Sequence, residues 1–202
     1  MRKDDKVRHL IAQEAAQIMY EEGGSEYRDA KRKAARHFGA EKMLSLGSHL
    51  PSNAEIHMEL QRLVGFLEEK VLPERLLQLR LMALRQMELL SPFRPYLVGS
   101  VLSGVVTAKS DIDLHLFAGS CAEVKNFLYE RRVTFEQEVV SIRHGGEFLD
   151  YLHIYLEDEG VAIECTVYPL EDLHRIPKSS ITGRRMERAD VKKLKKMMAE
   201  TA

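Results

Sequence analysis

The sequence has few cysteines and no long apolar run, and both absences narrow the classes of protein to which it can belong. Its 202 residues include only Cys121 and Cys165. They are too few for a disulfide framework or a cysteine zinc site, so we expect a reducing, cytoplasmic compartment. The longest mostly apolar stretch, residues 97–106, contains glycines and serines and is too short to cross a membrane. No apolar segment follows the charged N-terminus, so we expect no signal peptide.

The composition is that of a globular protein, but its charge is unevenly distributed. Apolar residues make up 45% and charged residues 30%, and the formal net charge is −1. Residues 175–202 contain nine Lys or Arg and three Asp or Glu, a balance of +6, which leaves −7 for the remainder. A basic tail of this kind suggests an anionic partner or docking against the acidic body, and a solvated lysine-rich helix explains it equally well.

Residues 1–91 have apolar side chains at helical spacing and predict a helical region. Two stripes are expected to face a core, one ending near Gly23 and the other at Gly39: Val7, Leu10, Ile11, Ile18 and Met19, then Tyr27, Ala30, Ala34 and Phe38. A loop around Gly47 follows. Ser52 and Glu55 have the spacing of a capping box and open a further helix. Pro73 begins another helix, rich in Leu and Met, that ends near Pro92.

After Pro92 the pattern changes to alternation and predicts a small sheet. Strands are expected near residues 96–98, 111–117, 133–143, 148–156 and 161–168, with helices at 122–130 and 187–198. This order predicts an α+β fold. We divide it into a helical region (1–91), a mixed-sheet core (92–172) and a basic C-terminal tail and helix (173–202).

The segment from Gly99 to Leu114 contains the residues that most clearly indicate a binding or catalytic site. A glycine bend at Gly99 leaves main-chain N–H groups accessible to an anion, and Ser100 adds a hydroxyl donor. Ten residues later, Asp111 and Asp113 are two apart on a strand and therefore point to the same face. A divalent cation between the two carboxylates would offset their repulsion, and Mg²⁺ binds a few carboxylates together with phosphate oxygens.

These motifs resemble the signature of the DNA polymerase β-like nucleotidyltransferase superfamily, in which Gly-Ser is followed by Asp-apolar-Asp-apolar. The matching residues are Val98-Gly99-Ser100 and Asp111-Ile112-Asp113-Leu114, and Gly104 and Ser110 also fit many small bacterial members. The resemblance implies a small mixed sheet with helices on one face and the site on the other. It further implies that Mg²⁺ or Mn²⁺ binds Asp111, Asp113 and a third carboxylate.

Glu164, in the run VAIECTVY, is our candidate for the third carboxylate, because an acidic residue inside an apolar strand needs a partner. The resemblance would make it a metal ligand, and it is also a candidate acceptor of the hydroxyl proton. The rival carboxylates are Glu136, Glu138 and Asp150. Cys165 is expected to point to the core side as inert packing.

The sequence departs from the family pattern directly after the Gly-Ser pair, where many small members carry a basic residue. Val101 and Leu102 stand there instead, and the first cation is Lys109. We therefore assign Gly99, Ser100, Ser110 and Lys109 to nucleotide binding and keep Arg94 and the basic tail as further sources of positive charge. The departure puts turnover in doubt more than it does the fold.

The resemblance implies an enzyme that transfers a nucleoside monophosphate from an NTP, with ATP favoured, to a hydroxyl group and releases pyrophosphate. The acceptor is a small molecule, a protein side chain or a nucleic-acid end. The alternatives are a catalytically weak module that binds nucleotide or RNA, and the nucleotidyltransferase partner of a toxin–antitoxin-type complex. Homo- or hetero-oligomers would form through the helical region.

Several other polar residues have two interpretations each. His115 and His153 could touch phosphate or metal, but hydrogen-bonded structural histidines are favoured. Arg28, Arg32 and Arg36 recur along one helical face and could grip nucleic acid, although a solvated face paired with acidic neighbours is favoured.

Overall fold

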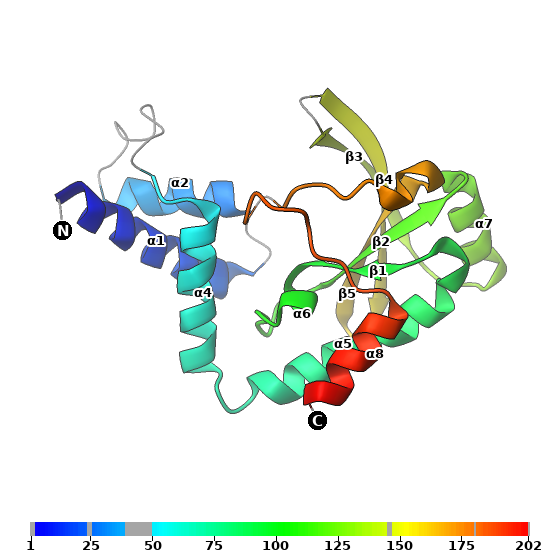
Figure 1. Cartoon of the computed structure of the whole chain (residues 1–202), viewed down its shortest axis with the longest axis horizontal. Helices are drawn as coiled ribbons and strands as arrows, with labels where there is room; N and C mark the ends of the chain where they lie inside the picture. The colour runs from blue at the N-terminus through cyan, green and yellow to red at the C-terminus, as the bar shows by residue number, and fades with distance from the viewer. Residues whose placement is uncertain (1–2, 24–25, 39–49, 145–146, 180, 202) are drawn as a thin grey trace. The chain divides into compact units, whose positions relative to one another are not determined.

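The computed structural model describes residues 3–23, 26–38, 50–144, 147–179 and 181–201, and it has an α+β fold, as the sequence predicted. The chain divides into two compact units (Figure 1). The helical unit comprises residues 1–73, 105–109 and 179–184, and the sheet unit comprises residues 74–104, 110–178 and 185–202. None of the described helices is long and apolar enough to cross a membrane.

The helical unit contains α1 (Lys3–Glu22), α2 (Tyr27–His37) and α4 (Asn53–Leu67), which bury their apolar faces in one core. The predicted capping box is confirmed. The Ser52 hydroxyl accepts from the Glu55 main-chain N–H, and the Ser52 main-chain N–H donates to Glu55 Oε2 at 2.7 Å. Glu55 also pairs with Arg8 of α1 at 2.6 Å, so the cap ties α4 to α1.

Two positions that we expected in this core are exposed, and those predictions are wrong. Leu10 is 44% exposed because its neighbour Ile11, which is fully buried, takes the inward position on α1. Phe38 is 41% exposed because α2 ends at His37, so the backbone has left the helix at Phe38. The predicted stop at Gly39 and the loop around Gly47 lie outside the described residues.

The sheet unit is built on a five-stranded mixed sheet with strand order β1-β2-β5-β4-β3. The strands are β1 (Tyr96–Leu97), β2 (Ile112–Ala118), β3 (Glu136–His144), β4 (Glu147–Asp158) and β5 (Val161–Pro169). β2 runs parallel to β5, and the other pairings are antiparallel. β2 and β5, which are far apart in sequence, are therefore direct neighbours in the centre of the sheet.

Helices before, between and after the strands complete the sheet unit. They are α5 (Leu72–Leu89, within this unit from Glu74 onward), α6 (Gly99–Ser103), α7 (Cys121–Glu130) and α8 (Val191–Thr201), with single-turn helices η1 (Ser91–Phe93) and η2 (Leu170–His174). We had placed α5 in the helical region from the sequence, and here most of it packs with the sheet unit.

The two faces of the sheet differ in polarity, and this difference positions the candidate site. On one face, Ile112, Leu114, Ile163 and Cys165 are fully buried, as the alternation predicted. The opposite face carries Asp113, Glu164 and the residues that alternate with them along β2 and β5. We call it the carboxylate face.

The C-terminal helix begins later than the sequence suggested, at Val191 rather than Glu187. Asp190 explains the difference, because its Oδ1 accepts from the Lys193 main-chain N–H at 2.7 Å and caps the helix there. Before the cap, Ala189 pairs with Leu97 of β1 through two main-chain hydrogen bonds of 2.8 and 3.0 Å. The residues predicted as the first helical turn are thus extended along the edge of the sheet.

Candidate metal centre

Three carboxylates converge on the carboxylate face of the sheet. Asp113 of β2 lies directly opposite Glu164 of β5 in the parallel register, and Asp111 precedes Asp113 by two residues. Each of the three offers one oxygen, and these oxygens all lie within 4.8 Å of one another. All three side chains are half-buried. The structure thus brings together the three residues that we selected as metal ligands.

The glycine bend lies against this cluster. Gly99 has a left-handed backbone (φ +69°), and a Cβ atom added to it would lie 1.9 Å from Asp113 Oδ2. The Val98 main-chain N–H also donates to the Asp113 carbonyl at 3.0 Å. We expected a strand followed by an anion-binding glycine bend, and in the structure Gly99 and Ser100 begin the short helix α6. Only glycine allows this close approach of the bend to the carboxylate.

Two buried groups near the bend bear on its role. The Ser100 hydroxyl is buried and has no hydrogen-bond partner among the described residues, which is unusual for a group that water no longer reaches. The buried Arg80 of α5 donates to the carbonyls of Val101 and Leu102 at 3.3 Å each, and these two hydrogen bonds fix α6 to α5. The bend is therefore fixed in place, while Ser100 keeps an unused donor.

The carboxylates are held in an unfavourable electrostatic environment. Burial, followed by the negative charges of Asp111 and Glu164, raises the pKa of Asp113 to about 7. The pKa of Asp111 is raised as well, chiefly by burial and further by Glu164. A divalent cation would relieve both effects, because it supplies positive charge and ligand bonds where water has been removed. The donor set, three carboxylate oxygens beside an unused hydroxyl, fits Mg²⁺ or Mn²⁺.

The raised pKa of Asp113 predicts that the metal-free protein becomes less stable to unfolding as the pH rises from about 4 to about 7. In that range the folded state holds a proton on Asp113 that the unfolded state has released, so the free energy of unfolding falls with rising pH. Urea titrations in EDTA at pH 5 and pH 8 should therefore show that Asp113→Asn stabilises the protein more at pH 8, with a difference on the order of 2 kcal/mol.

The variant must be compared with the wild type because the titration of His115 changes the free energy of unfolding in the opposite direction to that of Asp113. Burial, with the positive charges of Arg188 and His153, lowers the pKa of His115 to about 4. Its contribution to the free energy of unfolding therefore rises as the pH increases from about 4 to about 6.5. A stability difference between Asp113→Asn and wild type that is the same at both pH values would contradict the assignment to Asp113.

His153, which the sequence placed either near the site or in a structural hydrogen bond, is hydrogen-bonded to a carboxylate of the cluster. Its Nδ1 lies 2.6 Å from Glu164 Oε1, and its side chain is only 8% exposed. The ring nitrogen Nε2 is buried and finds no hydrogen-bond partner in the described part of the chain. His115, two residues from Asp113, packs its ring against Tyr168 at a centroid distance of 4.7 Å. The β4–β5 turn at Asp158-Glu159-Gly160 was the available signal, since counting back from it sets Tyr155 opposite Glu164 and His153 opposite Thr166.

The rival carboxylates lie away from the cluster. Glu136 and Glu138 are exposed on β3, the outermost strand, two strands beyond Glu164 in the sheet order. Neighbouring strands are about 4.8 Å apart, so these groups are roughly 10 Å from β5. The Asp150 carboxylate accepts a hydrogen bond from the Ser141 hydroxyl on β3. The choice of Glu164 over its rivals therefore agrees with the geometry.

The predicted nucleotide-binding residues beyond the bend are placed differently. Lys109 belongs to the helical unit, where its ammonium donates to the main-chain carbonyls of Glu21 and Glu22 at the end of α1. Ser110 directly precedes Asp111 in the sheet unit. Val101 and Leu102, which stand where a basic residue was expected, are buried.

Arg188 is a cation on this side of the sheet that sequence analysis missed. Its guanidinium lies 4.6 Å from the Tyr96 ring centre and 5.5 Å from the Phe117 ring centre. Nη2 donates to the Leu173 carbonyl at 2.9 Å, whereas Nη1 is buried without a hydrogen-bond partner among the described residues. The pairing of Ala189 with β1 sets Arg188 beside this strand. No local pattern in the basic tail distinguished it from its neighbours.

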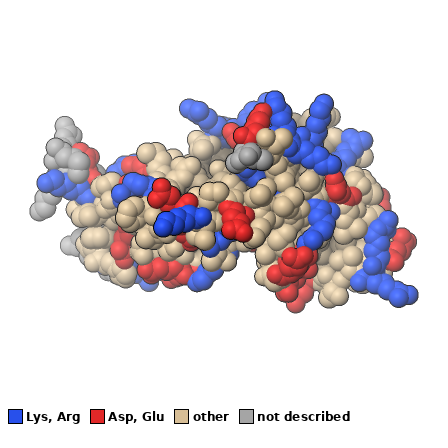
Figure 2. Space-filling view, turned by 90° about the horizontal axis from the view of Figure 1, so that it is seen from below, with Lys and Arg blue, Asp and Glu red and all other residues tan. Residues whose placement is uncertain are grey.

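Several of the other basic residues lie close to acidic side chains. Lys33 contacts Glu22 at 2.7 Å, and Arg28 lies 3.7 Å from Asp29, as expected for a solvated helical face. In the tail, Lys195 of α8 forms an ion pair with Glu88 of α5 at 2.7 Å. On the face drawn in Figure 2, basic and acidic side chains are intermixed.

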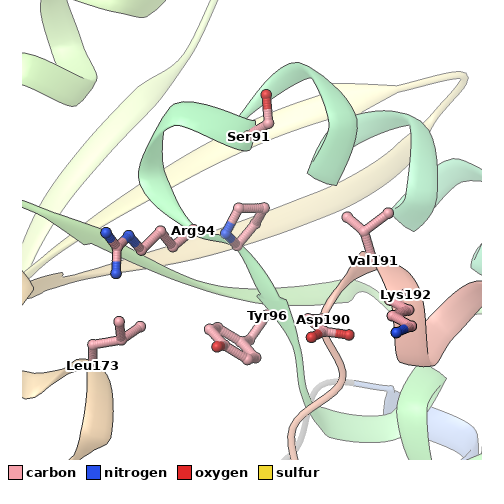
Figure 3. A pocket seen from close by; sticks show the side chains of 8 residues that line it. Ser91, Arg94, Tyr96, Leu173, Asp190, Val191 and Lys192 are labelled. Carbon is pink, nitrogen blue, oxygen red and sulfur yellow. The ribbon is translucent and has the colours of Figure 1, made fainter.

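A pocket of about 310 Å³ lies elsewhere in the sheet unit. In Figure 3, Tyr96 of β1 lies between Leu173 on one side and Asp190 on the other, with Arg94 above it. The pocket is lined by residues of η1, the start of β1, η2 and the start of α8: Ser91, Arg94, Pro95, Tyr96, Leu173, Asp190, Val191 and Lys192. It includes none of the three carboxylates, so it is distinct from the candidate metal centre.

Comparisons with known proteins add no assignment at this point. No family model, no curated protein and no solved structure matches this chain. The function must therefore be argued from the geometry of the site.

Proposed function

We propose that this protein is a nucleotidyltransferase that depends on a divalent metal ion and moves a nucleoside monophosphate from an NTP, with ATP favoured, to a hydroxyl group. The observation that supports this most strongly is the meeting of Asp111, Asp113 and Glu164, with oxygens within 4.8 Å, directly against the Gly99 bend. A carboxylate cluster that can hold a metal ion, beside a bend with an unused hydroxyl, suits a substrate that carries phosphate.

Each group has a defined part in this proposal. Asp111, Asp113 and Glu164 would hold Mg²⁺ or Mn²⁺, which, when bound, neutralises phosphate charge and favours ionisation of the acceptor hydroxyl. The unused Ser100 hydroxyl donates a hydrogen bond to a phosphate oxygen, and the backbone at Gly99 lets the phosphates approach closely. The acceptor oxygen bonds to the α-phosphorus, the bond to the α–β bridging oxygen breaks and pyrophosphate leaves. The acceptor proton passes to a carboxylate of the cluster.

A second candidate, a nucleotide-binding module with weak turnover, is favoured by one observation. Val101 and Leu102 are buried apolar residues where many small members of the family that the motif resembles carry a basic residue, and the Lys109 ammonium is held by main-chain carbonyls of the helical unit. Such a protein would bind a nucleotide and metal but release little pyrophosphate. The two candidates share the site and differ in the measured rate.

Thermal unfolding with each of the four NTPs, in the presence of Mg²⁺, Mn²⁺ or EDTA, tests the shared site. A metal–nucleotide complex at about 100 times its Kd stabilises the folded state by about 2.7 kcal/mol. We expect a rise in Tm of several degrees that requires the metal. Pyrophosphate release under the same conditions separates enzyme from binding module. No shift in Tm with any nucleotide and metal would contradict both candidates.

A further inference from the structure

The His153 side chain forms a hydrogen bond with Glu164, one of the three proposed metal ligands. Its Nδ1 and Glu164 Oε1 are 2.6 Å apart. Since a carboxylate offers only acceptors, the ring nitrogen is the donor, and one of the two Glu164 oxygens is occupied. Charge-assisted bonds of this length are among the stronger hydrogen bonds in proteins.

The surroundings of the ring keep this bond in place. His153 lies on β4, in antiparallel register with Thr166 of β5, and its side chain is 8% exposed. Among the described residues, the ring forms its hydrogen bond with Glu164 through Nδ1, while Nε2 is buried and has no partner there. A ring this deeply buried cannot turn without losing its packing, so Oε1 remains occupied.

We infer that His153 is a positioning residue that makes Glu164 a one-oxygen metal ligand and thereby selects Mg²⁺ or Mn²⁺ against Ca²⁺. The inference rests on the proposed function, because it assumes that the carboxylate cluster binds a metal ion. Mg²⁺ requires near-octahedral geometry with single oxygens, whereas Ca²⁺ takes six to eight oxygens and readily accepts both oxygens of one carboxylate. With Oε1 engaged by His153, only Oε2 of Glu164 is available to the ion.

The chain offers a matched pair of substitutions that separates donor position from packing. In His153→Asn the amide nitrogen takes the approximate place of Nδ1 and can still donate to Glu164. In His153→Gln it takes the approximate place of Nε2, so Oε1 is released. Both side chains are polar and smaller than or similar to histidine, so neither variant depends on a bulky replacement being tolerated in the sheet.

Metal binding, and not activity, is the measured quantity. Bound Mn²⁺ is followed by electron paramagnetic resonance at one fixed pH, and Ca²⁺ is then titrated in as a competitor. We expect wild type and His153→Asn to share one ratio of Ca²⁺ Kd to Mn²⁺ Kd. In His153→Gln this ratio should fall by about tenfold or more, because partners of metal ligands typically change metal affinity by about 10- to 100-fold.

Each result leads to a separate conclusion. If wild type binds no Mn²⁺, the proposed metal centre itself is wrong. If wild type binds Mn²⁺ but His153→Gln leaves the ratio unchanged, or weakens both ions equally, the histidine serves packing alone and the inference is overturned. A ratio that falls equally in His153→Asn would also overturn it, since that variant keeps the donor.

Discussion

We expect the Asp111→Ala variant to lose pyrophosphate release from an NTP by about 10³-fold or more while its fold is retained. The carboxylate is one of the three that meet within 4.8 Å, and its removal leaves the cluster with two ligands. The fold should not suffer, because burial and the charge of Glu164 already raise the pKa of Asp111, which marks it as a costly group in the metal-free protein. Steady-state pyrophosphate release and Tm are measured on the same samples.

Glu138→Gln is the matched control for this prediction. Glu138 is an exposed carboxylate on β3 of the same sheet and was a rival candidate in the sequence, but it lies outside the cluster. Its loss should leave pyrophosphate release within about twofold of wild type. Full activity in Asp111→Ala, or an equal loss in Glu138→Gln, would refute the assignment of the metal centre.

The parts of the site that the sequence could predict are those set by local periodicity. Alternation in Asp111-Ile112-Asp113-Leu114 predicts that both aspartates share a face, and in the structure their carboxylates meet in one cluster, although β2 begins only at Ile112. Glu164 was chosen by a physical argument, the cost of an acid within an apolar strand. What the sequence could not provide was the parallel pairing of β2 with β5 that sets Glu164 opposite Asp113, because strand order depends on the packing of the whole sheet.

The residues that were missed or misjudged depend on contacts between distant segments. Arg188 lies beside β1 because Ala189 pairs with Leu97, and no local pattern signals that pairing. Lys109 was read as a phosphate ligand from its place in the motif, whereas its ammonium donates to carbonyls at the end of α1. In both cases the side chain has the chemistry that was expected, but the partner is determined by tertiary structure.

The second large effect is expected at Gly99. In Gly99→Ala the new methyl group would lie 1.9 Å from Asp113 Oδ2 and 2.9 Å from its Cγ, and the residue would have to adopt φ +69°. Either the carboxylate or the bend must move. We expect a destabilisation of about 2–4 kcal/mol, which corresponds to a fall in Tm of roughly 5–15 °C, together with loss of Mn²⁺ binding.

Gly160→Ala separates the close contact from the backbone strain. Gly160 has a comparable left-handed backbone (φ +80°) in the same unit, but a Cβ atom there would meet nothing within 4 Å. It should therefore cost only the strain of the left-handed region, about 1–2 kcal/mol, and leave Mn²⁺ binding intact. If Gly99→Ala lowers the free energy of unfolding no more than Gly160→Ala does, the bend is not in close contact with the Asp113 carboxylate.

A double-mutant cycle identifies the atom responsible for the larger cost. In an Asp113→Ala background the carboxylate is absent, and the Cβ atom is all that remains of the side chain, 3.2 Å from the added methyl group. Gly99→Ala should then cost about as much as Gly160→Ala, because the strain persists while the clash is gone. The coupling free energy between positions 99 and 113 should therefore be on the order of 1–2 kcal/mol. A coupling near zero would mean that the chain requires glycine at position 99 for its backbone alone, and the bend would then lose its link to the metal centre.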